Sequence, residues 1–202
     1  MNIAIADDAI AADCSKHIDK LPSKLRKNAS SSDSSGIRRQ LSRIAHSPPS
    51  DIGFIGAKLA QAREQDLDVE QLKLMKKGIK KLKSNKDLRL KHRKLDMELS
   101  QLRARSDASF ASNRGETSQI GFIAMLSGKH DNACILHWSG NKRARATRSM
   151  LGAELRAFCD AMDFSTAIKI ALENMSQKEA PLFMFANSKS LFDTIAKKSQ
   201  IA

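Results

Sequence analysis

The apolar positions in the second half of the chain follow the pattern of strands, a long helix and a further strand. Three strand-like runs come first, at about residues 102–110, 120–126 and 133–138. A helix is predicted at about 147–175, and the continuous apolar run at 182–186 suits a buried parallel strand. Consecutive strands, a crossover helix and a further strand predict an α/β fold with a mixed sheet.

The predicted helix has an apolar face with one charged residue inside it. The apolar positions recur at helical spacing and are Leu151, Leu155, Phe158 and Met162. Glu154 lies inside this face, and the only cation beside it in sequence, Arg156, belongs to another face. A carboxylate facing the sheet is costly unless something pairs with it. A metal ion would supply that pairing, and so would a lysine or arginine from another element.

Two further polar residues are expected to converge with Glu154 at one edge of the sheet. Asp107 lies near the end of the first strand, and Asn187 directly follows the run at 182–186. Carboxylate oxygens from neighbouring elements are the ligands that Mg²⁺ ions need in two-metal phosphoryl-transfer sites. The simpler alternatives are that Asp107 ends a strand and that Asn187 is a turn or cap residue.

A basic amphipathic helix is predicted upstream, from about residue 68 to 84. Its apolar positions are Val69, Leu72, Met75, Ile79 and Leu82, and six lysines occupy the other faces. The following stretch, residues 86–94, alternates leucine with basic residues until the first strand begins. These cations form either a solvated face or a phosphate-binding surface.

The chain divides into three predicted segments. Residues 1–36 are expected to be a poorly ordered segment and Ser-rich linker, with a short helix at about 9–21. Residues 37–98 are expected to be mostly helical, with a basic helix at 37–46 that ends before Pro48. Residues 99–202 form the predicted α/β domain.

The charge of the chain favours a polyanionic partner. Its 202 residues carry a formal net charge of +13 at pH 7. We find neither an apolar run near the ~20 residues of a membrane span nor a secretory signal, so we expect no membrane partner and an intracellular location, in the cytoplasm or nucleus. The three cysteines are odd in number and scattered, which is typical of reduced thiols.

Five motifs in order resemble the ribonuclease H domain of copia-type LTR retrotransposon polyproteins. They are DASFASN at 107–113, TSQIGF at 117–122, ILHWS at 135–139, TRSMLGAEL at 147–155 and FANSKSLFD at 185–193. Residues 37–52 and 56–61 resemble the C-terminal end of that family's reverse transcriptase. Asp7-Asp8 also resembles the paired aspartates of a polymerase palm, although an exposed acidic pair is the simpler interpretation.

The resemblance implies a ribonuclease H-like fold, truncated at its C-terminus, and a partner that is an RNA–DNA hybrid or another nucleic acid. The family uses four acidic positions to hold Mg²⁺ or Mn²⁺, and Asp107 and Glu154 match the first two. Asn187 stands where the third acid belongs, and the chain ends before the fourth. We therefore expect a retrotransposon-derived fragment that binds nucleic acid, holds metal weakly and has lost catalysis. The alternative is an active metal-dependent ribonuclease H.

The resemblance also favours phosphate binding over a merely solvated face for the basic segment, which in the family lies beside the template-primer. A phosphate contact at the start of the last helix is an additional expectation, because backbone amides there favour an anion. The predicted nucleic-acid-binding residues are Lys73, Lys76, Lys77, Lys80, Lys83, Lys86, Arg89, Lys91, Ser188 and Lys189.

Overall fold

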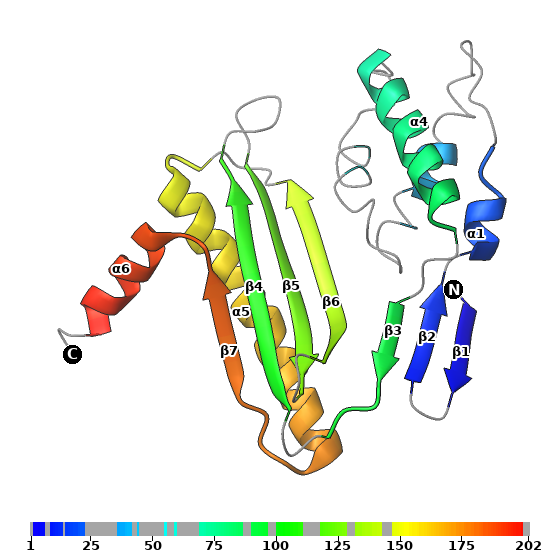
Figure 1. The fold of residues 1–202 in the computed structure, drawn as a ribbon. Helices are drawn as coiled ribbons and strands as arrows, with labels where there is room; N and C mark the ends of the chain where they lie inside the picture. The colour runs from blue at the N-terminus through cyan, green and yellow to red at the C-terminus, as the bar shows by residue number, and fades with distance from the viewer. Residues whose placement is uncertain are drawn as a thin grey trace. The chain divides into compact units, whose positions relative to one another are not determined.

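The computed structural model of the chain contains two compact units, residues 1–92 and 93–202 (Figure 1). It describes residues 2–6, 9–13, 15–22, 36–41, 44, 55, 59, 69–86, 90–96, 100–110, 118–128, 132–142 and 147–199. The expected boundary between residues 98 and 99 lies a little later in the chain than the boundary between these units. Each unit is described by itself below.

Among its described residues, the first unit combines a three-stranded sheet with helical segments that include α1 and α4. Strand β1 (Asn2–Ala6) pairs antiparallel with β2 (Ala9–Asp13), and β3 (Leu90–Arg93) completes the order β1-β2-β3. Helix α1 (Ser15–Asp19) follows β2, and α4 (Val69–Ser84) precedes β3. The core consists of buried apolar side chains from these helices and from positions between them: Ile18, Leu21, Leu41, Ile44, Ile55, Leu59, Met75, Ile79 and Leu82.

The N-terminal strands differ from our expectations for residues 1–36. The helix predicted at about 9–21 is wrong in its first part, because residues 9–13 form β2 and only residues 15–19 are helical. Isoleucines that alternate with alanine favour an extended chain, and the pairing of Ala6 with Ala9 brings the two strands together. Asp7 and Asp8 lie outside the described residues.

Helix α4 confirms the predicted basic amphipathic helix. Met75, Gly78, Ile79 and Leu82 are buried, whereas Val69 at the first position is exposed, contrary to its predicted place in the apolar face. Gly78 allows a close approach, because a Cβ atom there would lie 3.2 Å from the Ile55 side chain. Of the helix predicted at 37–46, residues 36–41 and 44 are helical, and the remainder lies outside the described residues.

The second unit is a four-stranded mixed sheet with a long helix on one face (Figure 1). Its strands are β4 (Gln101–Ser109), β5 (Gln119–Ser127), β6 (Ala133–Lys142) and β7 (Leu182–Ala186), in the order β6-β5-β4-β7. Strands β4, β5 and β6 are antiparallel neighbours, and β7 is parallel to β4. The predicted mixed α/β sheet is confirmed.

Helix α5 (Met150–Ser176) crosses from β6 to β7, as predicted, but it faces the sheet with a different set of residues. The buried positions recur mainly every four residues and are Ala153, Glu154, Ala157, Ala161 and Ser165. The predicted apolar face is wrong in part, because Leu155 and Met162 are exposed, whereas Leu151 and Phe158 are partly buried. Small side chains let the helix backbone lie close to the sheet, whereas the larger residues lie toward solvent at the margin of the contact.

Strand β7 is parallel, as predicted, but it is not buried. Phe183 and Phe185 expose 44% and 41% of their surface. The reason lies in the sheet order, because β7 is an edge strand and α5 covers only one face of it. Helix α6 (Lys189–Ser199) packs against α5. No helix among the described residues is both long enough and apolar enough to cross a membrane.

Candidate functional site

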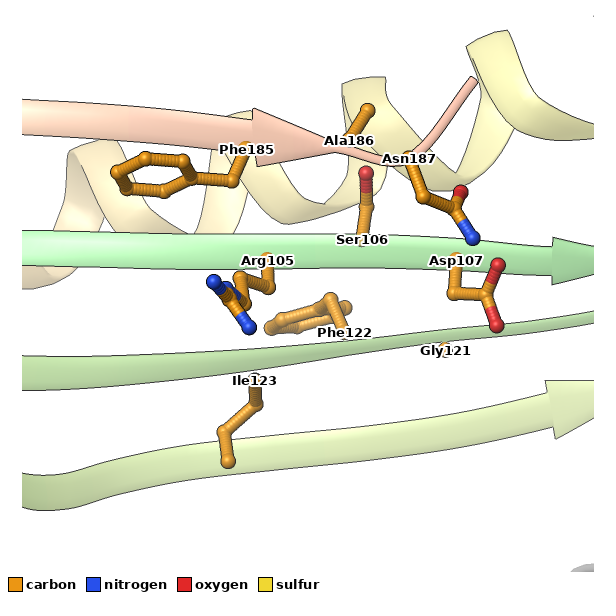
Figure 2. Close-up of a pocket in the computed structure, with 9 residues that line it drawn as sticks. All are labelled: Arg105, Ser106, Asp107, Gly121, Phe122, Ile123, Phe185, Ala186 and Asn187. Atoms are coloured by element: carbon orange, nitrogen blue, oxygen red, sulfur yellow. The ribbon is translucent and has the colours of Figure 1, made fainter.

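The carboxyl ends of β4 and β7 place two of the predicted site residues next to each other. Because Ser106 pairs with Ala186 in parallel register, Asp107 and Asn187 occupy neighbouring positions at one end of the sheet. Both line a shallow hollow of about 530 Å³ on the face opposite α5, together with Arg105, Ile123 and Phe185. Figure 2 shows the Asn187 amide and the Asp107 carboxylate at the same end of this hollow.

The third predicted residue, Glu154, lies early in α5 and is buried, with only 5% of its surface exposed. Its Oε2 atom has no hydrogen-bond partner among the described residues. Burial raises the pKa of this carboxyl, and the negative charge of Asp107 raises it further. The pKa of Glu154 therefore responds to Asp107, so the structure brings these two carboxylates into one electrostatic neighbourhood.

A pairing of Glu154 with a neighbouring cation is not found within the described residues. Arg156, the nearest cation in sequence, is directed to Asp160 with 3.9 Å between Arg156 Nε and Asp160 Oδ1. This exposed pair one turn apart contributes little to stability. The alternative interpretation of Glu154 as a member of a structural ion pair is therefore not supported in the part of the chain that the structure describes.

The start of α5 is held in place by two polar contacts, and these position Glu154. Ser149 is the N-cap, and its Oγ accepts a hydrogen bond from the Gly152 N–H at 3.1 Å. The hydroxyls of Thr147 and Ser118 are 2.8 Å apart, which ties a residue two positions before the cap to the residue before β5. Cap formation at Ser149 explains why α5 begins at Met150 instead of at Thr147, where the helix was predicted to start.

The far end of α5 is anchored by Glu173. Its side chain accepts hydrogen bonds from Lys169 and, at 2.9 Å, from the Ala180 N–H. The hydrogen bond from Lys169 makes the largest contribution to lowering the pKa of the Glu173 carboxyl, and the hydrogen bond from the Ala180 N–H makes the next largest. Gln177 ends the helix in the left-handed conformation with φ 55°. Together these contacts fix the connection from α5 into β7, and hence the place of Asn187.

The Asp107 carboxylate and the Asn187 amide at this edge, and the Glu154 carboxylate buried on α5, are groups that suit a hard divalent cation, and together they carry only two negative charges. A buried carboxylate oxygen without a hydrogen-bond partner, a second carboxylate and a side-chain amide are all oxygen ligands of the kind that Mg²⁺ and Mn²⁺ take. Within the described ranges, no group of three or more His, Cys, Asp or Glu side chains is arranged to hold a metal ion. Asn187 completes the set without adding charge, so binding at this site is expected to be weak.

The predicted nucleic-acid-binding residues lie in both units. Lys73, Lys76, Lys77, Lys80, Lys83 and Lys91 are exposed in the first unit. Lys86 forms an ion pair with Asp19 at 2.8 Å, so it is less available to phosphate, and Arg89 lies outside the described residues. In the second unit Ser188 caps α6 by accepting a hydrogen bond from the Leu191 N–H at 3.3 Å, and Lys189 is exposed.

Sequence reasoning missed the residues that form most of the hollow. Arg105, Ile123 and Phe185 line it, and the register places them in one row across β4, β5 and β7. The signal was present in β4, where Arg103, Arg105 and Asp107 alternate with the buried Leu102, Ala104 and Ser106. That alternation indicates a solvated face on the strand that carries the site.

No protein-family model matches the chain, and no curated protein is significantly similar to it in sequence.

Proposed function

We propose that the chain binds RNA–DNA hybrids and that its residues 93–202 are a ribonuclease H-like module, derived from a copia-type retrotransposon, which no longer cleaves them. The observation that carries this proposal is the parallel register that sets Asp107 beside Asn187 at one end of a mixed sheet, with the buried Glu154 on the crossover helix. Two of the three residues are acids that the resemblance assigns to a nuclease site, and the third is the amide of an acid.

The arrangement of elements supports the proposal. Three antiparallel strands, a crossover helix and a strand parallel to the first bring Asp107 and Asn187 from separate parts of the chain to the same edge. A fold of this kind positions polar groups at the carboxyl ends of its parallel strands. Glu154 is supplied by α5, the helix that crosses from β6 to β7.

In a working site of this kind, bound Mg²⁺ or Mn²⁺ activates the attacking water and stabilises the leaving oxygen. Asp107 and Glu154 would hold such an ion, and Asn187 would offer a neutral oxygen beside them. The Glu154 carboxylate must be ionised to bind metal, and its raised pKa opposes ionisation. The amide at Asn187 removes the charge that would offset this cost. Weak metal binding is the physical reason for the proposed loss of cleavage.

The lysines of α4 supply the second part of the proposal. Lys73, Lys76, Lys77, Lys80 and Lys83 are exposed on one helix whose opposite face is anchored in the core of the first unit. A rigid row of cations of this kind binds the phosphate backbone without reading sequence. The lysines therefore favour a duplex partner over a small-molecule ligand.

A cleavage assay tests the loss of catalysis. The full chain is incubated with a labelled RNA–DNA hybrid in Mg²⁺ and then in Mn²⁺, and the products are resolved on a denaturing gel. We expect no measurable cleavage in Mg²⁺ and at most a trace in Mn²⁺, and Asn187→Asp alone should not restore full activity. Robust Mg²⁺-dependent cleavage that Asp107→Asn abolishes would overturn this part and establish the active nuclease instead.

A binding titration tests the basic surface. Replacing Lys76, Lys80 and Lys83 together by glutamine should weaken binding to hybrids of any sequence. It should also reduce the slope of the logarithm of the association constant against the logarithm of the salt concentration by about 2 to 3. The matched control removes the same charge from Lys20, Lys94 and Lys197, which are exposed elsewhere. Equal losses in both triple variants would show that net charge alone, and not α4, determines binding.

A further inference from the structure

The face of the four-stranded sheet opposite α5 is open and carries aromatic and cationic side chains. The register places Phe185, Arg105, Ile123 and Trp138 in one row across the four strands. Phe183, Arg103, Met125 and Ile135 form the neighbouring row. The described part of the unit places no helix on this face, because α5 covers the other face and α6 packs against α5.

The aromatic residues on this face are accessible and lie next to arginines. Phe183 and Phe185 are among the exposed large apolar residues, and Arg103 and Arg105 are exposed between them and β5. The Arg105 guanidinium lies 5.7 Å from the centroid of the Phe185 ring, and Figure 2 shows both side chains on the hollowed face. A planar group that stacks on Phe185 would therefore also lie beside a cation.

The chemistry of this face matches one kind of partner better than others. Unpaired bases stack on aromatic rings, and the phosphates between them pair with arginine, whose planar guanidinium has five donors. At about 4.8 Å between strands, Phe185 and Trp138 are roughly 14 Å apart, which leaves room for two or three bases across the sheet. A chain with a net charge of +13 also attracts polyanions from a distance.

The competing occupants fit less well. In a duplex the base faces are stacked on one another, so the rings on this sheet would have nothing to stack on. A second copy that packed with the same face would bring Arg103 and Arg105 of both chains together and bury their charges. An apolar helix from another protein would face the same cost of burying both guanidinium groups.

We propose that this open face binds single-stranded nucleic acid, with bases on Phe183, Phe185 and Trp138 and phosphates on Arg103 and Arg105. The inference goes beyond the proposed function, because it assigns unpaired bases to the open sheet face and not to α4. Arg105 and Phe185 belong to this face and also line the hollow beside Asp107 and Asn187. It requires neither a metal ion nor cleavage.

The single tryptophan of the chain makes a direct test possible. The full chain is titrated with a ten-nucleotide oligouridylate in EDTA, while tryptophan fluorescence and the anisotropy of a labelled copy are recorded. We expect quenching of Trp138 that saturates together with the anisotropy. An abasic strand of the same length and charge should bind weakly and leave the fluorescence unchanged. Equal quenching by both strands would overturn the assignment of bases to this face.

Paired variants separate this face from the rest of the molecule. Phe183→Leu with Phe185→Leu keeps the apolar character but removes two rings, and affinity for the oligouridylate should fall at least about tenfold. The control, Phe192→Leu, removes an exposed ring from α6 in the same unit and should change affinity less than twofold. Equal effects in the two proteins would reject the proposal.

Two further results distinguish this inference from its competitors. Hybrid binding should be weakened in the α4 lysine variant and retained in the double phenylalanine variant, so the two hypotheses are tested separately. Sedimentation velocity should show that mass does not depend on concentration. A concentration-dependent dimer that the double phenylalanine variant abolishes, without any oligouridylate binding, would show that a second copy occupies this face.

Discussion

The two faces of the four-stranded sheet differ in how residue size relates to burial. Between α5 and the sheet, Ala104 of β4 and Ala153, Ala157 and Ala161 of α5 are each at most 1% exposed, and the sheet also buries larger side chains there, such as Leu102. The opposite face presents Phe183 and Phe185 to solvent. Close approach of a helix to a sheet requires small residues, and a face that no layer covers tolerates large ones. Size alone therefore did not indicate which positions are buried in this unit.

Adjacent residues of β4 offer the strongest test of this difference. Ala104→Leu adds volume under α5, where Ala104 is fully buried, and should lower the free energy of unfolding by about 1–3 kcal/mol. Arg105→Leu puts the same residue on the open face, where the lost cation–π contact costs at most about 1 kcal/mol. Urea unfolding followed by circular dichroism measures both. Similar losses in the two variants would mean that the open face is covered in solution.

The buried carboxylate of the α5 face gives the next largest effect. The folded pKa of Glu154 is raised above its usual value of 4.5, so its contribution to stability is lost as pH rises through the folded pKa. Glu154→Gln should therefore raise the melting temperature at pH 7 by roughly 2–5 °C in metal-free buffer, and the gain should disappear below about pH 4.5. The exposed Glu179→Gln is the control. If Glu154→Gln raises the melting temperature equally at all pH values, the gain does not come from removing the ionised carboxylate.

Metal binding tests whether the two faces of the sheet share one site, because the ion would be held by Glu154 under α5 and by Asp107 on the open face. Mn²⁺ at ten times its dissociation constant should stabilise the chain by about 1.4 kcal/mol, measured as a shift in melting temperature. Glu154→Gln and Asp107→Asn should each abolish the shift. If both variants respond to Mn²⁺ as the unaltered chain does, the ion binds elsewhere and the proposed site loses its support.

The smallest expected effect concerns the anchor at the end of α5. Because the pKa of Glu173 is lowered by hydrogen bonds from Lys169 and Ala180, its contribution is present at neutral pH and is lost as pH falls through the folded pKa. Glu173→Gln should lower the melting temperature at pH 7, by less than Glu154→Gln raises it, since the side chain is more exposed and screened by solvent. Thermal scans at pH 7 and pH 3 should show the difference only at pH 7.

Local pattern determined the order and type of the main elements. Strand runs at β4, β5, β6 and β7, the crossover helix and the lysine-bearing α4 were all predicted, because periods of 2 and 3.6 residues are properties of the chain itself. The candidate residues Asp107, Glu154 and Asn187 were also named from sequence.

Tertiary structure decided which faces meet. The buried side of α5 could not be read from sequence, because Leu155 and Met162 mark one helical face and Ala153, Ala157 and Ala161 mark another, and only the distance between helix and sheet selects the second. The same holds for β7. Its apolar run suits a buried strand, but the sheet order places it at an edge, where it is exposed. Burial of Glu154 next to Asp107, and the open row of Phe185, Arg105, Ile123 and Trp138, likewise depend on register and crossing. These are relations between distant segments, and no local period encodes them.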